Sequence, residues 1–218
     1  MSSRININSS EPAVHARRRF LQASLASVVM APLAGKALAG VVVSDPSLAA
    51  GGHPALIAAK ASLERLGARV SYTDVVAVAD FGQASRMPRL HLVNIAGGRV
   101  ESLLVAHGRG SDPAHTGWLQ NFSNQPGSLA TSQGAYLTGA YYSGRHGRSM
   151  RLEGLDPSND NALERGIVIH AAPYVGLDAV REQGMVGRSE GCFAVSQTDI
   201  DSVLDRLAPG RLLIAAKL

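Results

Sequence analysis

The sequence predicts a mainly β domain with one helix near its N-terminal side and a second helix late in the chain. Between residues 73 and 172, short runs rich in β-branched and aromatic residues alternate with glycines, a pattern typical of strands joined by tight turns. Apolar residues at helical spacing occur instead at residues 54–66 and 196–210. Residues 111–134 follow neither pattern.

The first helix is predicted from Pro54 to Leu66, because the apolar spacing spans these residues and Gly67 supplies a stop signal. The predicted strand runs then follow at 75–82, 89–98, 99–110, 134–144, 148–155 and 166–172. Glycine-containing turns join the second run to the third and the fourth to the fifth. We therefore expect two hairpins.

Residues 111–134 are dense in turn-forming residues and predict a long surface loop. A loop of this length inside a compact domain is commonly functional. The late helix is expected within residues 196–210, with Ser196 or Thr198 as its N-cap. Residues 211–218 predict a closing strand.

The N-terminal segment has the order of a secretory signal peptide of the twin-arginine type. Arginines at 17–19 precede a short apolar run over 23–33, and the segment ending at Ala39 predicts cleavage after that residue. An uncleaved membrane anchor is disfavoured, because Pro32 and Lys36 interrupt the run and a spanning helix needs about 20 apolar residues. We predict an exported protein of the bacterial periplasm or cell envelope, with no stable membrane span after cleavage.

The net positive charge of the chain comes from this leader. Residues 1–39 contain five of the 21 Lys and Arg side chains and one of the 17 Asp and Glu side chains, which leaves 16 of each among the remaining 179 residues. The mature composition therefore gives no indication of nucleic-acid binding. A chain of this length suits one core, and we divide it into an N-terminal helical segment at 40–72 and a main domain at 73–218.

Cys192 is the only cysteine in the chain, so no internal disulfide can form. An unpaired thiol is open to oxidation in an oxidising compartment. One interpretation is a buried small hydrophobe. The other is a nucleophile, because Cys192 follows Gly191 in a turn-like segment before the apolar residues 193–195. Such a turn would present the sulfur and nearby backbone N–H groups to a carbonyl.

A thiol nucleophile usually depends on a histidine base, and the mature chain has six histidines. His170 is the strongest candidate, because it ends an apolar run on the last predicted strand before Cys192. His107 ends another apolar run, and His146 lies in a predicted hairpin turn. The other three fit a strand or a solvated loop: His53, His91 and His115. For each histidine taken alone, a structural role is the commoner one.

Several segments together resemble the catalytic domain of the murein L,D-transpeptidases, which have the YkuD-type fold. The segments are "GIVIHAAPYV" at 166–175, "GRSEGCFAV" at 187–195 and "SNQPGSLATSQGAYLTG" at 123–139. A closer subgroup also shows "VAHGRGS" and "LEGL...N..A..R.IVIH", which this chain has at 105–111 and 152–170. The resemblance covers residues 73–216. It implies a β-rich fold with mixed sheets, peptidoglycan stem peptides as partners, and no cofactor.

The family pattern assigns roles to four residues of the cysteine segment and its neighbour strand. Cys192 becomes the nucleophile and His170 its general base. Ser189 and Gly191 match the S-x-G-C signature, and the N–H groups of Gly191 and Cys192 are the implied oxyanion donors.

The chain departs from the family pattern at three positions. Glu190 stands where the wider family usually has histidine, Phe193 where the closer subgroup usually has proline, and Ser132 where proline is common. These changes leave the thiol and its base in place. They bear on the shape and charge of the acyl pocket.

The implied reaction is a two-step acyl transfer. The Cys192 thiolate attacks the carbonyl that joins meso-diaminopimelate to the terminal D-alanine of a tetrapeptide stem, and His170 protonates the departing amine. A second stem's amine then gives a 3-3 cross-link, whereas water gives an L,D-carboxypeptidase; attachment of a protein to the wall is a third outcome. Such a substrate is zwitterionic or anionic, so cationic side chains are candidate carboxylate clamps. The candidate substrate-binding residues are Arg188, as the preferred one, with His107, Arg109, Arg145, His146 and, further, Arg148.

Three alternatives remain beside this hypothesis. The first is a catalytically silent cell-wall-binding module on the same fold. The second is a zinc peptidase with His107, His146 and His170 as ligands, which is disfavoured because the chain has no H-x-H or H-E-x-x-H spacing. The third is a sortase-like cysteine transpeptidase, which is disfavoured because its T-L-x-T-C setting is absent. The sequence does not predict the oligomeric state.

Overall fold

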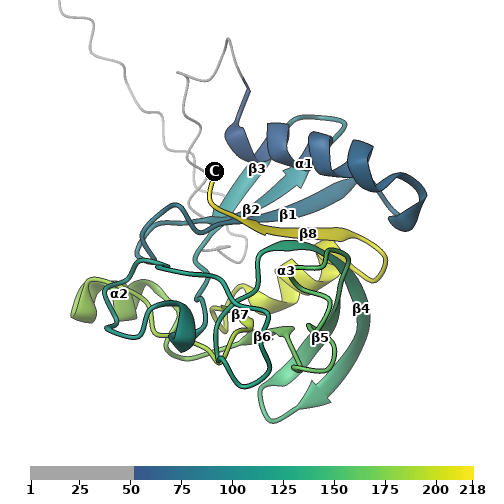
Figure 1. Cartoon of the computed structure of the whole chain (residues 1–218). Coiled ribbons are helices and arrows are strands. Elements are labelled where there is room, and N and C mark those ends of the chain that lie inside the picture. The colour runs from purple at the N-terminus through teal and green to yellow at the C-terminus, as the bar shows by residue number, and fades with distance from the viewer. Residues whose placement is uncertain (1–51) are drawn as a thin grey trace, which may run out of the picture. The chain divides into compact units, whose positions relative to one another are not determined.

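The computed structural model describes residues 52–218, and the leader predicted at residues 1–39 lies outside this range. The described part has one mixed eight-stranded sheet and three α-helices (Figure 1). The prediction of a mainly β fold with an N-terminal helix is therefore confirmed. The strands are β1 (Val75–Asp80), β2 (Leu90–Asn94), β3 (Val100–Leu103), β4 (Gly134–Gly144), β5 (Gly147–Gly154), β6 (Val168–Ala171), β7 (Phe193–Val195) and β8 (Leu212–Ala216). The α-helices are α1 (Pro54–Leu66), α2 (Leu177–Gln183) and α3 (Ile200–Leu207), and short 3-10 turns cover Gly67–Arg69 and Arg109–Ser111.

The strand order is β3-β2-β1-β8-β4-β5-β6-β7, which places the last strand of the chain in the middle of the sheet. β8 is parallel to β1 and antiparallel to β4. The predicted hairpins are present as the antiparallel pairs β2–β3 and β4–β5. At the far edge β6 and β7 run parallel, so both strands point toward the same end of the sheet.

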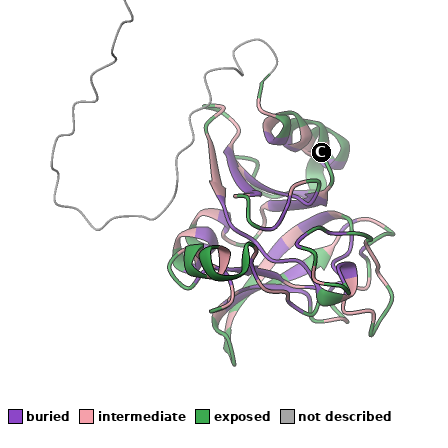
Figure 2. Cartoon of the chain, turned by 90° about the vertical axis from the view of Figure 1, so that its left-hand side faces the viewer, coloured by how far each residue is buried: buried purple, intermediate pink, exposed green. Residues whose placement is uncertain are grey.

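Helices cover the two faces of the β1 region, and the side chains of β1 alternate between them. Val76 and Val78 pack in one apolar cluster with the buried residues of α1. Ala77 and Ala79 pack in the main cluster with those of α3. Figure 1 shows α1 and α3 on opposite sides of the sheet, and Figure 2 shows that buried residues concentrate in the strands between them.

The two predicted helices form, with one correction at the start of α3. In α1 the His53 side chain accepts a hydrogen bond from Ala55 N, and Gly67 ends the helix as predicted. The N-cap of α3 is Asp199, not Ser196 or Thr198. Ser196 Oγ instead accepts a hydrogen bond from Asp199 N in the turn before the helix.

Two elements were not predicted, and one predicted run is divided. α2 buries none of its residues completely, and β7 has only three residues, so neither gives a periodic signal. The predicted strand at 99–110 is β3 for only four residues. The chain then crosses to the other edge of the sheet, where Ala106 forms an isolated bridge with Ala194 of β7. Within residues 52–218, none of the helices has the length and apolar character needed to cross a bilayer.

Candidate active site

The cysteine loop, residues 188–192, ends at the start of β7 and is closed by the side chain of Ser189. Ser189 Oγ donates a hydrogen bond to Cys192 O over 2.6 Å and accepts one from Gly191 N over 3.2 Å. The Ser189 side chain is buried. The serine of the signature therefore holds the turn that presents the cysteine, and it also occupies the Gly191 N–H group that the sequence suggested as an oxyanion donor.

Only glycine fits at position 191 of this loop. Its φ is +117°, a region that disfavours side chains, and a Cβ atom there would lie 2.8 Å from Ala130 O. Gly108 has a related constraint, because its Cβ would lie 2.8 Å from the Cα of Gly191. The two glycines allow the 107–110 backbone to lie directly against the cysteine loop.

His170 lies on the same face of the β6–β7 pair as Cys192. The parallel register pairs Ile169 with Phe193, and both of these side chains are in the main apolar cluster. Because side chains alternate along a strand, His170 and Cys192 face the opposite side. Both line one cavity on that side.

The hydrogen bonding of His170 fixes which ring nitrogen can act as a base. Nδ1 lies 2.9 Å from Ala171 O, a carbonyl that can only accept, so Nδ1 carries the proton and Nε2 has the free lone pair. Burial lowers the pKa of His170 below its usual value, and the charges of His146 and Arg145 act in the same direction. The imidazole is therefore neutral near pH 7.

The Cys192 thiol is also neutral in the resting structure. Sγ lies 3.7 Å from Gly166 O, a weak contact. Burial raises the pKa of Cys192; a backbone hydrogen bond and the charge of Arg165 act against burial but are outweighed. The site thus contains a thiol and a neutral histidine base, not a preformed thiolate.

The cavity beside Cys192 has a volume of about 730 Å³ and is lined from four parts of the chain. These are the long loop, the tip of the β4–β5 hairpin, the segment leading into β6, and the cysteine loop with its neighbours. The main lining residues are Arg109, Leu129, Tyr142, Arg145, His146, Glu164, Arg165, His170, Tyr174, Arg188, Ser189, Glu190 and Cys192. Six of these side chains are ionic: four arginines and two glutamates.

Four of the six candidate substrate-binding residues line this cavity, and each already has a protein partner. Arg109 Nη2 donates to Glu190 Oε1 over 2.9 Å. Arg145 Nε donates to His146 Nε2 over 2.8 Å, and the His146 ring stacks on that of His170 with centroids 4.3 Å apart. Arg188 donates to the carbonyls of Asp112 and Pro113.

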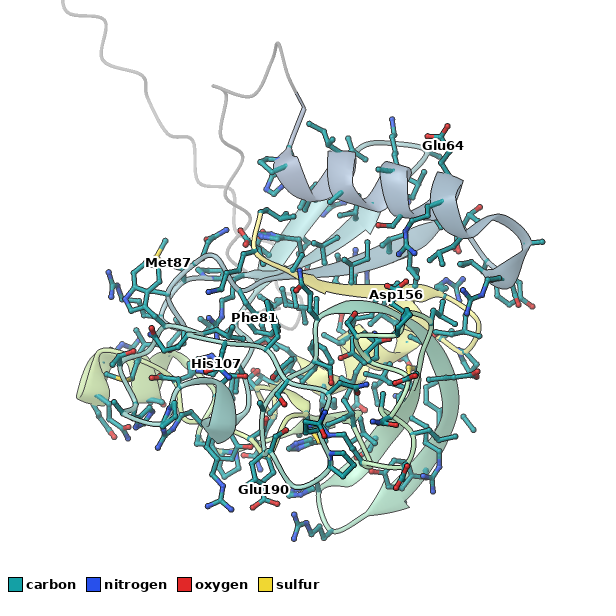
Figure 3. All side chains as sticks on the ribbon, in the orientation of Figure 1. Glu64, Phe81, Met87, His107, Asp156 and Glu190 are labelled. Carbon is teal, nitrogen blue, oxygen red and sulfur yellow. The ribbon has the colours of Figure 1, made fainter. Side chains whose placement is uncertain are left out.

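The structure does not bring His107 or Arg148 to the cavity. Arg148 instead pairs with Asp201 and Asp205 of α3. His107 is buried, and in Figure 3 it lies on the α2 side of the domain. Neither side chain lines the cavity that contains Cys192.

His107 belongs to a buried charged cluster that includes Arg89 and Asp112. Arg89 Nη2 lies 2.7 Å from His107 Nδ1, and because arginine only donates, Nδ1 accepts and the ring proton is on Nε2. That nitrogen lies 3.5 Å from Asp112 Oδ2 and makes no hydrogen bond within the described residues. Burial lowers the pKa of His107 to about 4, so the ring is neutral.

The backbone of this cluster is joined directly to the cysteine loop. Ser189 N donates to His107 O over 2.9 Å, and Arg109 N donates to Ser189 O over 2.8 Å. Thr131 Oγ1 connects a third segment, because it accepts from Gly108 N and donates to Gly191 O. The "VAHGRGS" segment is thus a support for the loop that presents Cys192.

The family model for the L,D-transpeptidase catalytic domain matches residues 55–215, from the start of α1 to within β8. This chain belongs to that family. The match includes α1, which the sequence analysis had assigned to a separate N-terminal segment at 40–72. That division, the leader at 1–39 and the main domain at 73–218 remain predictions. No curated protein matches the chain.

Three solved structures are similar to this L,D-transpeptidase domain at low identity. An L,D-transpeptidase from Mycobacterium smegmatis is 16% identical with a TM-score of 0.41, over 65% of this chain and 58% of that one. L,D-transpeptidase 3 from Mycobacterium tuberculosis is 18% identical with a TM-score of 0.39, over 65% and 60%. The helical cell shape determining protein Pgp2 from Campylobacter jejuni is 14% identical with a TM-score of 0.43, over 73% and 55%. The chain spans less than two thirds of the length of each.

Arg165 is a cavity residue with many contacts that was not among the candidates from the sequence. Its guanidinium donates to four atoms of the long loop: Ser123 O, Ser128 Oγ, Ala130 O and Ser132 Oγ. The signal was present, because Arg165 is the arginine of the "LEGL...N..A..R.IVIH" pattern of this L,D-transpeptidase subgroup. Asn159 of the same pattern is buried and donates to Ala135 O of β4, which anchors the segment that carries Arg165.

The zinc-peptidase alternative required His107, His146 and His170 to meet. His146 and His170 stack, but His107 lies in the buried cluster behind the cysteine loop. In the part of the chain that the structure describes, no three His, Cys, Asp or Glu side chains are grouped to hold a metal ion. The arrangement of the histidines therefore gives no support to a metal centre.

Proposed function

We propose that this domain is a peptidoglycan L,D-transpeptidase in which Cys192 forms a thioacyl intermediate. The observation that carries the proposal is the placement of Cys192 and His170 on one face of the β6–β7 pair, in a cavity rich in arginine. Family membership supports the same reaction class. No cofactor is needed, because acyl transfer to a thiol requires only a nucleophile, a base and an oxyanion donor.

In the first step His170 Nε2 accepts the thiol proton as Cys192 Sγ attacks the carbonyl that precedes the terminal D-alanine. The Cys192 N–H group stabilises the oxyanion, since Gly191 N–H is taken by Ser189 Oγ. His170 then gives its proton to the D-alanine nitrogen, and the C–N bond breaks. Because the pKa of His170 is lowered, its imidazolium is a stronger acid and gives up the proton more readily in this second transfer.

In the second step an amine of another stem attacks the thioester, and Cys192 leaves. The product is a 3-3 cross-link. Water as the acceptor gives the L,D-carboxypeptidase reaction at the same site. The arginines of the cavity suit a donor stem that carries carboxylates.

We also propose that the leader at residues 1–39 directs export by the twin-arginine route, so that the domain acts in the periplasm or cell envelope. Arginines 17–19 and the cleavage segment ending at Ala39 support this. Mass analysis of the protein purified from the cell envelope should give a mature chain that begins at Gly40. A chain that retains residues 1–39 there would contradict the proposal.

The reaction is tested by intact mass after incubation with a tetrapeptide muropeptide or a carbapenem. We expect one covalent adduct on the wild-type protein and none on Cys192→Ser. His170→Gln should slow adduct formation by about a hundredfold or more, the usual contribution of a general base. His115→Gln is a matched control, because His115 lies outside the cavity, and should form the adduct at the wild-type rate.

The products identify the acceptor. Cross-linked dimers with loss of D-alanine support the transpeptidase, and tripeptide alone supports the carboxypeptidase. A folded wild-type protein that forms no adduct would instead support the silent cell-wall-binding module.

A further inference from the structure

Glu190, two residues before Cys192 along the chain, forms an exposed ion pair with Arg109 at the rim of the cavity. Arg109 Nη2 lies 2.9 Å from Glu190 Oε1, and both side chains are more than half exposed, at 53% and 57%. Figure 3 shows Glu190 pointing away from the ribbon. An exposed pair of this kind contributes only about 0–1 kcal/mol to stability. A ligand can therefore separate it at little cost.

The backbones that carry these two side chains are fixed relative to each other. Gly108 and Ser189 form a parallel bridge, and Arg109 N donates to Ser189 O over 2.8 Å. The buried cluster around His107 lies directly behind this bridge. The backbones of a cationic and an anionic residue are thus held side by side at the cavity that contains Cys192.

The other arginines of the cavity also have protein partners, and Arg145 has one through Nε alone, which donates to His146. Arg165 binds four atoms of the long loop, and Arg188 binds the carbonyls of Asp112 and Pro113. Among the described residues the Arg109 side chain donates only to Glu190, through Nη2, and Glu190 Oε2 accepts from none. This pair keeps hydrogen-bonding capacity for a ligand with both signs of charge.

An α-amino acid head group has that chemistry, because an ammonium and a carboxylate share one carbon. We propose that Arg109 and Glu190 form the acceptor site, where Arg109 binds the carboxylate and Glu190 binds the amino group of a zwitterionic α-amino acid centre. The inference rests on the proposed function and deepens it. It also gives a role to the glutamate that stands where the wider family usually has histidine.

The bound acceptor then reacts as its neutral amine, after it has lost one proton to solvent. The nitrogen attacks the thioester carbon, the N–C bond forms, and the second amine proton passes to His170 Nε2. The C–S bond breaks, and His170 returns this proton to the Cys192 sulfur. Glu190 takes no proton in this sequence; its carboxylate accepts an N–H hydrogen bond and directs the amine in preference to water.

The test measures acceptor use by Glu190→Gln, Arg109→Gln and the double variant, with a tetrapeptide donor. The probes are a D-α-amino acid, its amide, which lacks the carboxylate, and the matching α-hydroxy acid, which lacks the amine. A charged hydrogen bond that is lost should raise KM for the amino acid by about tenfold or more in each single variant. The share of thioacyl enzyme lost to water should rise in parallel. Arg109→Gln should also abolish the preference for the amino acid over its amide.

Glu101→Gln is the control, because Glu101 forms an ion pair with Arg206 over 2.6 Å and does not line the cavity. It should leave acceptor KM unchanged. Adduct formation with a carbapenem reports the first step separately. Unchanged acceptor KM in both single variants, with Cys192 still acylated, would overturn the acceptor site and leave the proposed function intact. A wild-type protein that is not acylated would overturn both.

Discussion

At the scale of single residues, the candidate site depends on how the His170 ring is held. One side of the ring is fixed by the hydrogen bond to Ala171 O, and its face is covered by His146. Arg145 in turn orients His146 through Nε2. The hairpin tip therefore positions the His170 ring as well as lining the cavity.

Removing the stacked ring should change both the rate and its dependence on pH. In His146→Ala the His170 ring gains water and loses a neighbouring charge, and both changes raise its pKa toward the usual value. A base with a higher pKa is protonated at higher pH, so the acidic limb of the acylation rate should move to higher pH. A stack of this kind is worth about 0.5–1.5 kcal/mol, which corresponds to a roughly two- to tenfold loss in rate.

The measurement is the pH profile of carbapenem acylation for wild type and His146→Ala. His115→Ala is the control, since it removes an imidazole outside the cavity. A lower rate with an unmoved acidic limb would show that His146 acts only on the shape of the cavity.

The sequence predicted that Cys192 and His170 would meet, because a turn-borne cysteine and a strand-end histidine are local patterns. It could not predict that His107, also at the end of an apolar run, is buried. That outcome depends on Arg89 and Asp112, which lie 18 residues before His107 and five after it and approach it only in the fold.

At the scale of elements, the long loop at 112–133 has one side chain, Arg165, that joins four of its residues. Arg165 forms hydrogen bonds with residues 123, 128, 130 and 132, and the same loop supplies Leu129 to the cavity. A segment without helix or strand is thus given a defined position beside Cys192. The sequence predicted the loop from its turn residues, but its anchor comes from a distant segment.

Arg165→Lys should loosen this loop while keeping a positive charge near Cys192. Lysine cannot form the planar fork, so several of the four hydrogen bonds are lost, at a cost of about 1–3 kcal/mol in the free energy of unfolding. Hydrogen exchange of residues 123–132 should become faster, and KM for the donor stem should rise.

Chemical denaturation and peptide-level hydrogen exchange would measure both effects. Arg86→Lys, at an exposed position, should change neither. Exchange in 123–132 that matches wild type would show that the loop is held by its other contacts.

The length of an element decided whether the sequence could predict it. α2 has seven residues and β7 has three, and patterns this short are too weak to recognise in the sequence. α1 and α3 were predicted because each has a periodic apolar face that packs on the sheet.

At the scale of the whole molecule, buried neutral histidines link stability to pH. Burial lowers the pKa of His91 and of His107 from 6.5 to about 4. Below pH 6.5 the two histidines bind protons in the unfolded chain but stay neutral in the folded chain. Their contribution to the free energy of unfolding is therefore complete above pH 6.5 and is lost as the pH falls toward 4. Each histidine accounts for roughly 3 kcal/mol over this window.

Denaturant midpoints at pH 7.5, 6, 5 and 4 should fall steadily across this range. His91→Gln should reduce the slope, because one titrating group is removed, and the hydrogen bond to Ser102 can be kept by the amide. His115→Gln should leave the slope as in wild type. A midpoint that stays constant between pH 6.5 and 4 would contradict the assignment of both histidines as buried and neutral.

The bridge between Ala106 and Ala194 has a further consequence for the order of biosynthesis. The support at 105–111 is translated some 80 residues before the cysteine loop that it holds, and the central strand β8 is translated last of all. Until the cysteine loop and β8 leave the ribosome, the apolar core that buries Arg89 and His107 is incomplete. A nascent or truncated chain should therefore show no acylation of Cys192, so that thiol reactivity becomes a readout of completed synthesis.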